Sequence, residues 1–166
     1  MPRSVRRFSL LSGVVLCAIL GGPLAVAQAS DNTIRSTINH YAPIICAHTT
    51  ASGICTKGEE AAVTRGLEGY PGSHQRLVSA LGREVATLRA MKRKLISESA
   101  SSAAGSKGKK DIVKGLTLIA NAYAALRHDV QVANGGSVPA SNVNAAVSTD
   151  KKGRKKLGAG LTLLGG

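Results

Sequence analysis

Apolar residues recur at intervals of three and four through most of this chain, and this spacing restricts the possible folds more than any other feature. Three successive segments follow it: Val78, Leu81, Val85, Leu88 and Leu95; then Ile112, Leu116, Ile119, Tyr123, Leu126 and Val130; then Val143, Val147, Leu157, Leu161 and Leu164. Residues at this spacing share one face of an α-helix. No stretch alternates apolar and polar residues for long enough to predict a strand, and only 2% of the residues are aromatic. The sequence therefore predicts an all-α fold.

Residues that start or stop helices divide the chain further. We expect Asp31 to cap a first helix that Pro43 bends or restarts, and residues 48–57 to form a loop before a short second helix over residues 56–70. Residues 97–106 are rich in Ser, Ala and Gly and predict a turn. The sequence Asn134-Gly135-Gly136 ends the next helix, and Pro139 starts the last one. That last helix either continues through Gly153 or divides there. Long amphipathic helices with short connections pack antiparallel, so we expect an up-and-down bundle of four or five helices in one domain, residues 30–166.

The first 29 residues have the pattern of a secretory signal peptide. Residues 1–7 carry three arginines and no acid, and residues 8–20 are uncharged and mostly apolar. Small residues follow at 25–29 and predict cleavage after Ala27 or Ala29. A retained membrane anchor is disfavoured, because spanning a bilayer takes roughly 20 apolar residues. We expect a mature protein that is secreted, or held in the periplasm or cell envelope, and that has no transmembrane segment.

Cleavage would leave Cys46 and Cys55 as an even pair of cysteines in an exported chain. An oxidising compartment favours a disulfide between them, which would stabilise the fold by roughly 2.5–3 kcal/mol. The alternative is a metal or haem site, because His40 and His48 flank Cys46 and the residue types suit zinc. Their spacing does not match the usual zinc patterns. We therefore predict the disulfide and no bound cofactor.

Two segments of the chain resemble each other. Residues 107–119 read KGKKDIVKGLTLI, and residues 152–164, offset by 45, read KGRKKLGAGLTLL; seven of the thirteen positions are identical. A chain rich in Lys, Gly, Leu and Ala can also produce such a match by coincidence. Gly115 and Gly160 each cost about 1 kcal/mol of helix propensity relative to alanine. We expect these glycines to let two helices approach closely.

Basic residues give the chain a formal charge of +13, and residues 83–166 hold a net +10 of it. Most of them fall into three clusters: Arg89, Lys92, Arg93 and Lys94; Lys107, Lys109, Lys110 and Lys114; Lys151, Lys152, Arg154, Lys155 and Lys156. If the helices turn back near residues 102 and 135, all three clusters lie toward one end of the bundle. Concentrated like charge suits an anionic partner. Ordinary solvated lysines are the alternative.

The sequence contains no recognisable catalytic arrangement. It lacks a G-x-S-x-G motif, and the segment from Gly105 to Lys110 lacks the spacing of a phosphate-binding loop. Export and the scarcity of aromatic residues disfavour nucleic acid as a ligand. We expect a non-enzymatic exported protein that binds an anionic envelope polymer, or lipid headgroups, through the basic end of its bundle. The alternatives are a metal or haem carrier using His40 and His48, and a membrane-active effector.

Overall fold

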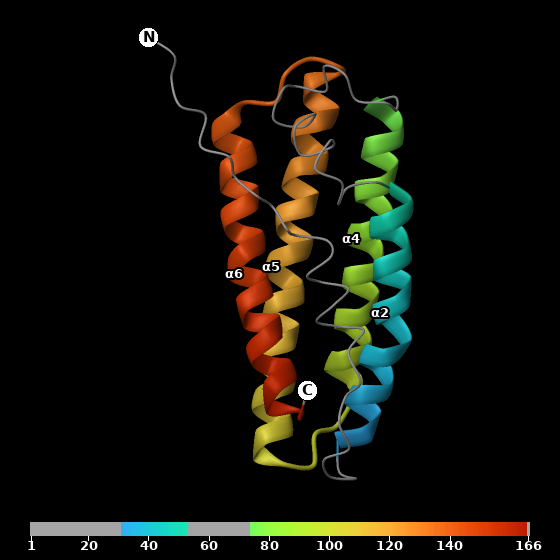
Figure 1. The fold of residues 1–166 in the computed structure, drawn as a ribbon, viewed down its shortest axis with the longest axis vertical. Helices are drawn as coiled ribbons and strands as arrows, with labels where there is room; N and C mark the ends of the chain where they lie inside the picture. Colours follow the sequence, from blue (N-terminus) through green and yellow to red (C-terminus); the bar gives the residue numbers. More distant parts are fainter. Residues whose placement is uncertain (1–30, 53–73, 166) are drawn as a thin grey trace.

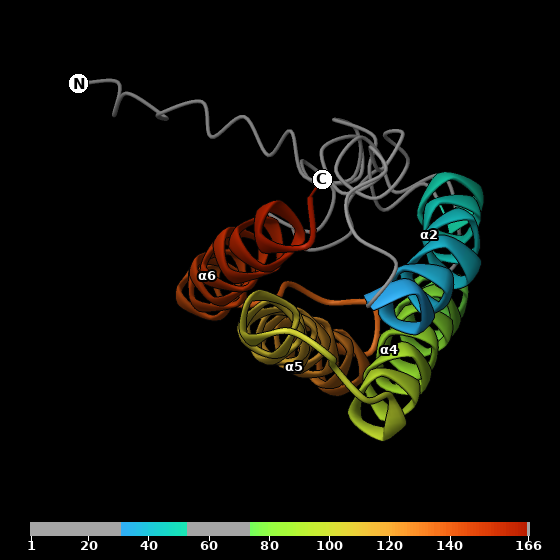
Figure 2. The same ribbon diagram turned by 90° about the horizontal axis from the view of Figure 1, so that it is seen from below.

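The computed structural model describes residues 31–52 and 74–165, except for the side chains of residues 46–52. In these ranges the chain forms four helices and no strand: α2 (Asn32–Ser52), α4 (His74–Ser97), α5 (Ala103–Ala133) and α6 (Ala140–Leu163). The helices lie side by side, and each runs antiparallel to the described helix before it (Figure 1). Viewed along their axes, they form a curved layer in the order α2, α4, α5, α6 (Figure 2). The all-α prediction is confirmed for this part of the chain. The proposed signal peptide and second helix lie outside it.

The predicted apolar faces form the core. Its largest fully buried side chains come from α2, α4 and α5: Ile34, Ile38, Ile45, Leu77, Leu81, Leu88, Met91, Leu95, Ile112, Leu116 and Ile119. Burying one such side chain contributes about 1.5–3 kcal/mol to folding. Lys92 interrupts the apolar spacing on α4, and the core is continuous there because the preceding residue, Met91, is fully buried. Val143, Leu157 and Leu161 add the buried face of α6.

Two serines and Asp31 hold the start of α5. Ser102 is the N-cap: its hydroxyl accepts a hydrogen bond from the backbone N–H of Gly105 at 2.8 Å and donates one to Asp31 Oδ2 at 2.7 Å. Ser101 donates its backbone N–H and its hydroxyl to Asp31 Oδ1 at 3.0 and 3.2 Å. The bond from Ser102, followed by those from Ser101, lowers the pKa of the Asp31 carboxyl, although burial opposes the shift. We expected Asp31 to cap α2, but its carboxylate instead ties the start of α2 to the turn between α4 and α5.

α2 is longer than the sequence indicates, and the alternative left open for α6 is resolved. α2 is one helix with Pro43 inside it, and it continues to Ser52, where we expected a loop from residue 48. The side chain of Pro43 is exposed. α6 is also one helix and passes through Gly153 without dividing. The end of α5 follows the prediction, because Asn134 adopts the left-handed conformation at φ 45° and caps it.

Candidate functional site: a cationic surface on α4, α5 and α6

The antiparallel packing brings the three basic clusters to similar heights along the layer. The cluster on α4 precedes the α4–α5 turn and the cluster on α5 follows it, so that Lys109 Nζ donates to the carbonyl oxygen of Glu98 at 2.6 Å. The cluster on α6 lies beside α5, since Gly153 packs against Gly115 and Lys156 Nζ is 3.3 Å from Asp111 Oδ1. The clusters therefore occupy the region between the α4–α5 turn and the middle of α5.

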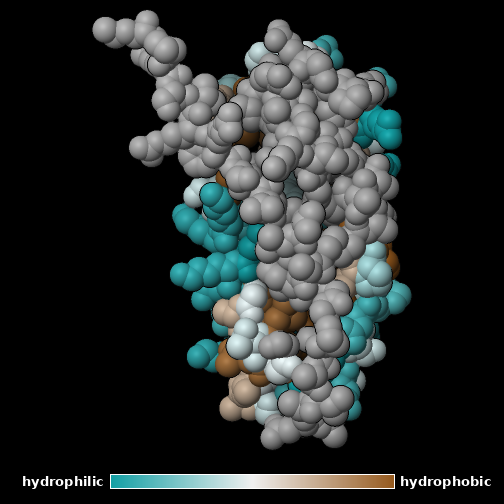
Figure 3. Space-filling view, viewed as in Figure 1, coloured by the Kyte–Doolittle hydropathy of each residue, from teal (hydrophilic) through white to brown (hydrophobic). Residues whose placement is uncertain are grey.

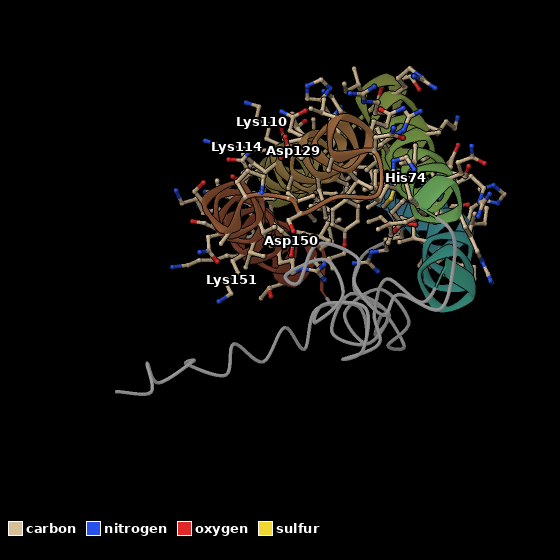
Figure 4. All side chains as sticks on the ribbon, turned by 90° about the horizontal axis from the view of Figure 1, so that it is seen from above. His74, Lys110, Lys114, Asp129, Asp150 and Lys151 are labelled. Carbon is tan, nitrogen blue, oxygen red and sulfur yellow. The ribbon has the colours of Figure 1, made fainter. Side chains whose placement is uncertain are left out.

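Eight cations of these clusters have no hydrogen-bond or ion-pair partner among the described residues. They are Arg89, Lys92 and Arg93 on α4, Lys107, Lys110 and Lys114 on α5, and Lys152 and Lys155 on α6. All except the half-buried Lys92 are exposed. We call these eight residues the cationic surface. Lys110 and Lys114 project outward from α5 (Figure 4), and hydrophilic side chains gather along the edge of the molecule that α6 forms (Figure 3).

Three other cations of the clusters are already engaged. Lys94 Nζ lies 2.7 Å from the carboxylate of Glu98, which raises the pKa of Lys94 and lowers that of Glu98. Lys109 binds backbone carbonyls of the α4–α5 turn, and Lys156 pairs with Asp111. Lys151 is exposed on α6. Glu98 and Asp111 thus each face a lysine of their own, and neither neutralises the cationic surface.

Arg154 is separate from the surface cations, because it is buried and only 9% exposed. Its Nε lies 2.6 Å from Asp150 Oδ2, and its terminal nitrogen donates to the hydroxyl of Tyr123 at 3.1 Å. This group bridges α5 and α6, and Asp150 lies on the inner side of the layer (Figure 4). The sequence signal for it was a pair of charged residues four apart on the apolar face of α6. We expected Arg154 among the anion-binding residues, and its burial excludes it from the exposed surface.

Glycines set the close approach of α5 and α6. A Cβ added to Gly115 would lie 2.7 Å from the carbonyl oxygen of Gly153, and one added to Gly108 would lie 2.9 Å from that of Gly160. The reciprocal distances, from Gly153 to the Gly115 carbonyl and from Gly160 to the Gly108 carbonyl, are 2.9 and 2.6 Å. Backbone therefore packs on backbone at both contacts. The expectation that Gly115 and Gly160 allow close approach is met: Gly115 packs against Gly153, and Gly160 packs against Gly108.

The two similar segments form this interface with approximate two-fold symmetry. In the offset of 45, Gly108 corresponds to Gly153, and Gly115 corresponds to Gly160. In the structure, however, Gly108 packs against Gly160, and Gly115 packs against Gly153. The same holds for larger side chains: Ile112 lies over Gly160 as its equivalent Leu157 lies over Gly115. Asp111 and Lys156 are themselves equivalent, and they pair where the symmetry axis passes between the helices. The two-fold axis is normal to the layer of helices, so equivalent residues of α5 and α6 lie on the same face of the layer.

The residues considered for metal binding do not form a site in the described ranges. No group of three or more His, Cys, Asp or Glu residues there could hold a metal ion. His40 is exposed, with its ring edge-on to Tyr41 at 5.0 Å between centroids. Cys55, and the side chains of Cys46 and His48, lie outside the described part, so the disulfide remains a prediction. An open hollow lined by His74, Gln75, Val78, Ser79 and Gln131 lies away from the cationic surface.

Comparison with protein-family models, with curated proteins and with solved structures gave no match to this chain. In the described part, no helix combines the length and apolar character needed to cross a membrane.

Proposed function

We propose that the mature protein is exported and non-enzymatic, and that it binds an anionic component of the cell envelope, a polymer or lipid headgroups, through the cationic surface. The observation that carries this proposal is the set of eight cations, without a partner among the described residues, at similar heights on three adjacent helices. Like charges held close together repel and lower the stability of the fold. A polyanion relieves this repulsion when it binds, which makes the free energy of binding favourable.

The surface suits charge-based recognition of a polymer rather than recognition of bases. Aromatic rings that stack on bases are a main source of affinity for single-stranded nucleic acid. Tyr123 is buried beside Arg154, and Tyr41 is on α2, so neither described tyrosine belongs to the cationic surface. Six of the eight cations are lysines, which bind anions as point charges without a fixed geometry. This composition favours a ligand defined by its charge.

Binding to long-chain polyphosphate, with uncharged dextran as the negative control, tests the proposal. Each phosphate contact lowers the slope of log affinity against log salt by about 0.7. Between 50 and 200 mM salt, affinity should therefore fall by about 10²-fold for roughly five contacts and by about 2 × 10³-fold if all eight cations are engaged. The double variant Lys110→Gln/Lys114→Gln should flatten this slope by about 1.4. The matched control Arg83→Gln/Arg127→Gln removes the same charge from outside the surface and should change the slope less.

Two results would contradict the proposal. One is no binding to polyphosphate or to anionic vesicles at low salt; the other is equal loss in the two double variants. Export is tested separately, by N-terminal sequencing of the mature protein, which should begin after residue 27 or 29. A mature chain that begins at residue 1 would refute it.

A further inference from the structure

The symmetry of α5 and α6 extends to the cationic surface. Lys107 and Lys110 on α5 correspond to Lys152 and Lys155 on α6 in the offset of 45. All four side chains are exposed and have no partner among the described residues. Because the two-fold axis is normal to the layer, both pairs lie on the same face of it, on either side of Asp111 and Lys156, and Lys110 projects outward from that face (Figure 4). The molecule thus presents the same lysine pair twice.

We propose that these two lysine pairs are equivalent subsites for two phosphate groups of one linear polyanion. This inference rests on the proposed function and specifies its ligand as a polymer that repeats its negative charge. Within each pair the lysines are three residues apart, so their side chains are neighbours on the helix and both reach one phosphate. Lysine is a common ligand for phosphate as a point charge, and neither pair contains an arginine to impose bidentate geometry.

The structure sets the distance between the subsites. The pairs are centred near Gly108 on α5 and near Gly153 on α6, and Gly153 packs opposite Gly115. The seven residues from Gly108 to Gly115 correspond to about 11 Å along the helix. Helices in close contact lie about 8 Å apart, so the subsites are separated by about 14 Å. A ligand must span this distance to occupy both.

Further cations near the subsites favour a continuous chain over two separate ions. Lys114 is exposed on α5 at the level of the α6 pair, because Gly115 packs opposite Gly153, and its equivalent on α6 is Ala159. Lys156 lies between the pairs and is paired with Asp111. A polymer bound at one subsite reaches the second at high effective concentration, which raises affinity by about 10²–10⁴-fold without new kinds of contact.

Two probes of different length distinguish the subsites from a diffuse charge effect. Tripolyphosphate is too short to reach both pairs, so we expect two molecules to bind each protein, weakly and with equal affinity. Long-chain polyphosphate should bind tightly with one engaged segment per protein. NMR titration of the backbone amides of α5 and α6 gives the stoichiometry, and calorimetry gives the affinity.

Three double variants then test the equivalence. Lys107→Gln/Lys110→Gln and Lys152→Gln/Lys155→Gln should each reduce tripolyphosphate binding from two molecules to one. Each should also lower the affinity for the long chain, by about 10²-fold and by the same factor. The control Arg89→Gln/Arg93→Gln removes two charges of the cationic surface from α4. It should retain two tripolyphosphate sites and lose less affinity for the long chain. Far-UV circular dichroism checks that each variant is folded.

The outcomes separate this inference from the proposed function. Equal losses in the α4 control and the two lysine-pair variants would overturn the subsites while leaving a polyanion-binding surface. Unequal losses in the two lysine-pair variants would also overturn the equivalence. Binding to anionic vesicles without binding to polyphosphate would identify lipid headgroups as the ligand and overturn the linear polymer. If the protein binds neither, the proposed function fails with the inference.

Discussion

Substituting alanine for Gly115 tests the close contact between α5 and α6. The new Cβ would lie 2.7 Å from both the carbonyl oxygen of Gly153 and the backbone nitrogen of Leu157, whereas ordinary contacts begin at 3.4 Å. Both atoms belong to the backbone of α6, so no side-chain rotation removes the overlap. The two helices must separate locally by about 0.7 Å to accept one methyl group.

The expected cost follows from two opposing effects. Alanine favours the helix by about 1 kcal/mol relative to glycine. Overpacking a close contact costs about 1–3 kcal/mol, and separation also weakens the packing of Ile112 and Leu157 against the facing backbone. We expect Gly115→Ala to lower the free energy of unfolding by about 1–2 kcal/mol. Gly158→Ala is the matched control: its Cβ meets nothing within 4 Å, so the propensity effect acts alone and should stabilise the protein by about 1 kcal/mol.

Urea unfolding followed by far-UV circular dichroism measures both variants. The midpoints should move in opposite directions at an unchanged m-value. The two-fold symmetry adds a further condition: Gly160→Ala, at the position equivalent to Gly115, should lose a similar free energy, within about 0.5 kcal/mol. If Gly115→Ala proves as stabilising as Gly158→Ala, the backbone contact described above is wrong.

Other parts of the molecule give three further predictions. Asp31→Asn should lower the free energy of unfolding by about 1–2 kcal/mol above pH ~4. The difference from the unmodified protein should disappear as pH falls through the lowered pKa of Asp31, because protonation of the carboxylate removes the same interaction. A difference that persists at low pH would contradict this. Arg154→Ala should lower the free energy of unfolding by about 3–5 kcal/mol, because it leaves Asp150 buried without a counter-ion. The double variant Asp150→Leu/Arg154→Met should lower it much less, and thermal unfolding measures both variants. Intact-mass measurement before and after reduction and alkylation tests the Cys46–Cys55 disulfide, and an alkylated protein without prior reduction would exclude it.

Local sequence patterns identified the three C-terminal helices because their stabilising contacts follow the helix period. The stop at Asn134 is similarly local, since that residue takes the left-handed conformation itself. The end of α2 was missed because Thr and Ser after His48 are typical of loops, yet the helix continues to Ser52. The role of Asp31 was missed for another reason. Its partners, Ser101 and Ser102, are distant in the sequence, so only the fold brings them together.

The cationic surface was predictable in composition but not in detail. The positions of the clusters followed from antiparallel helices with short turns. Arg154 could not be separated from its neighbours by counting charges, because its burial depends on a partner in its own helix and on Tyr123 of the adjacent one. The sequence match between residues 107–119 and 152–164 suggested a shared packing solution. It did not indicate that the two segments pack against each other, because a pairing between helices is a property of the tertiary structure.

The glycine pairs also limit how the two similar segments can change. A protein usually accommodates a bulkier residue when its neighbour becomes smaller, but glycine has no side chain that could become smaller. A change at Gly108, Gly115, Gly153 or Gly160 therefore has no compensating exchange on the opposite helix. Exposed positions are under no such restraint, and some of them already differ between the two segments, as Lys114 and Ala159 do. Substitutions can therefore change the charges on the exposed surface, whereas the glycines at the contact between α5 and α6 must stay the same.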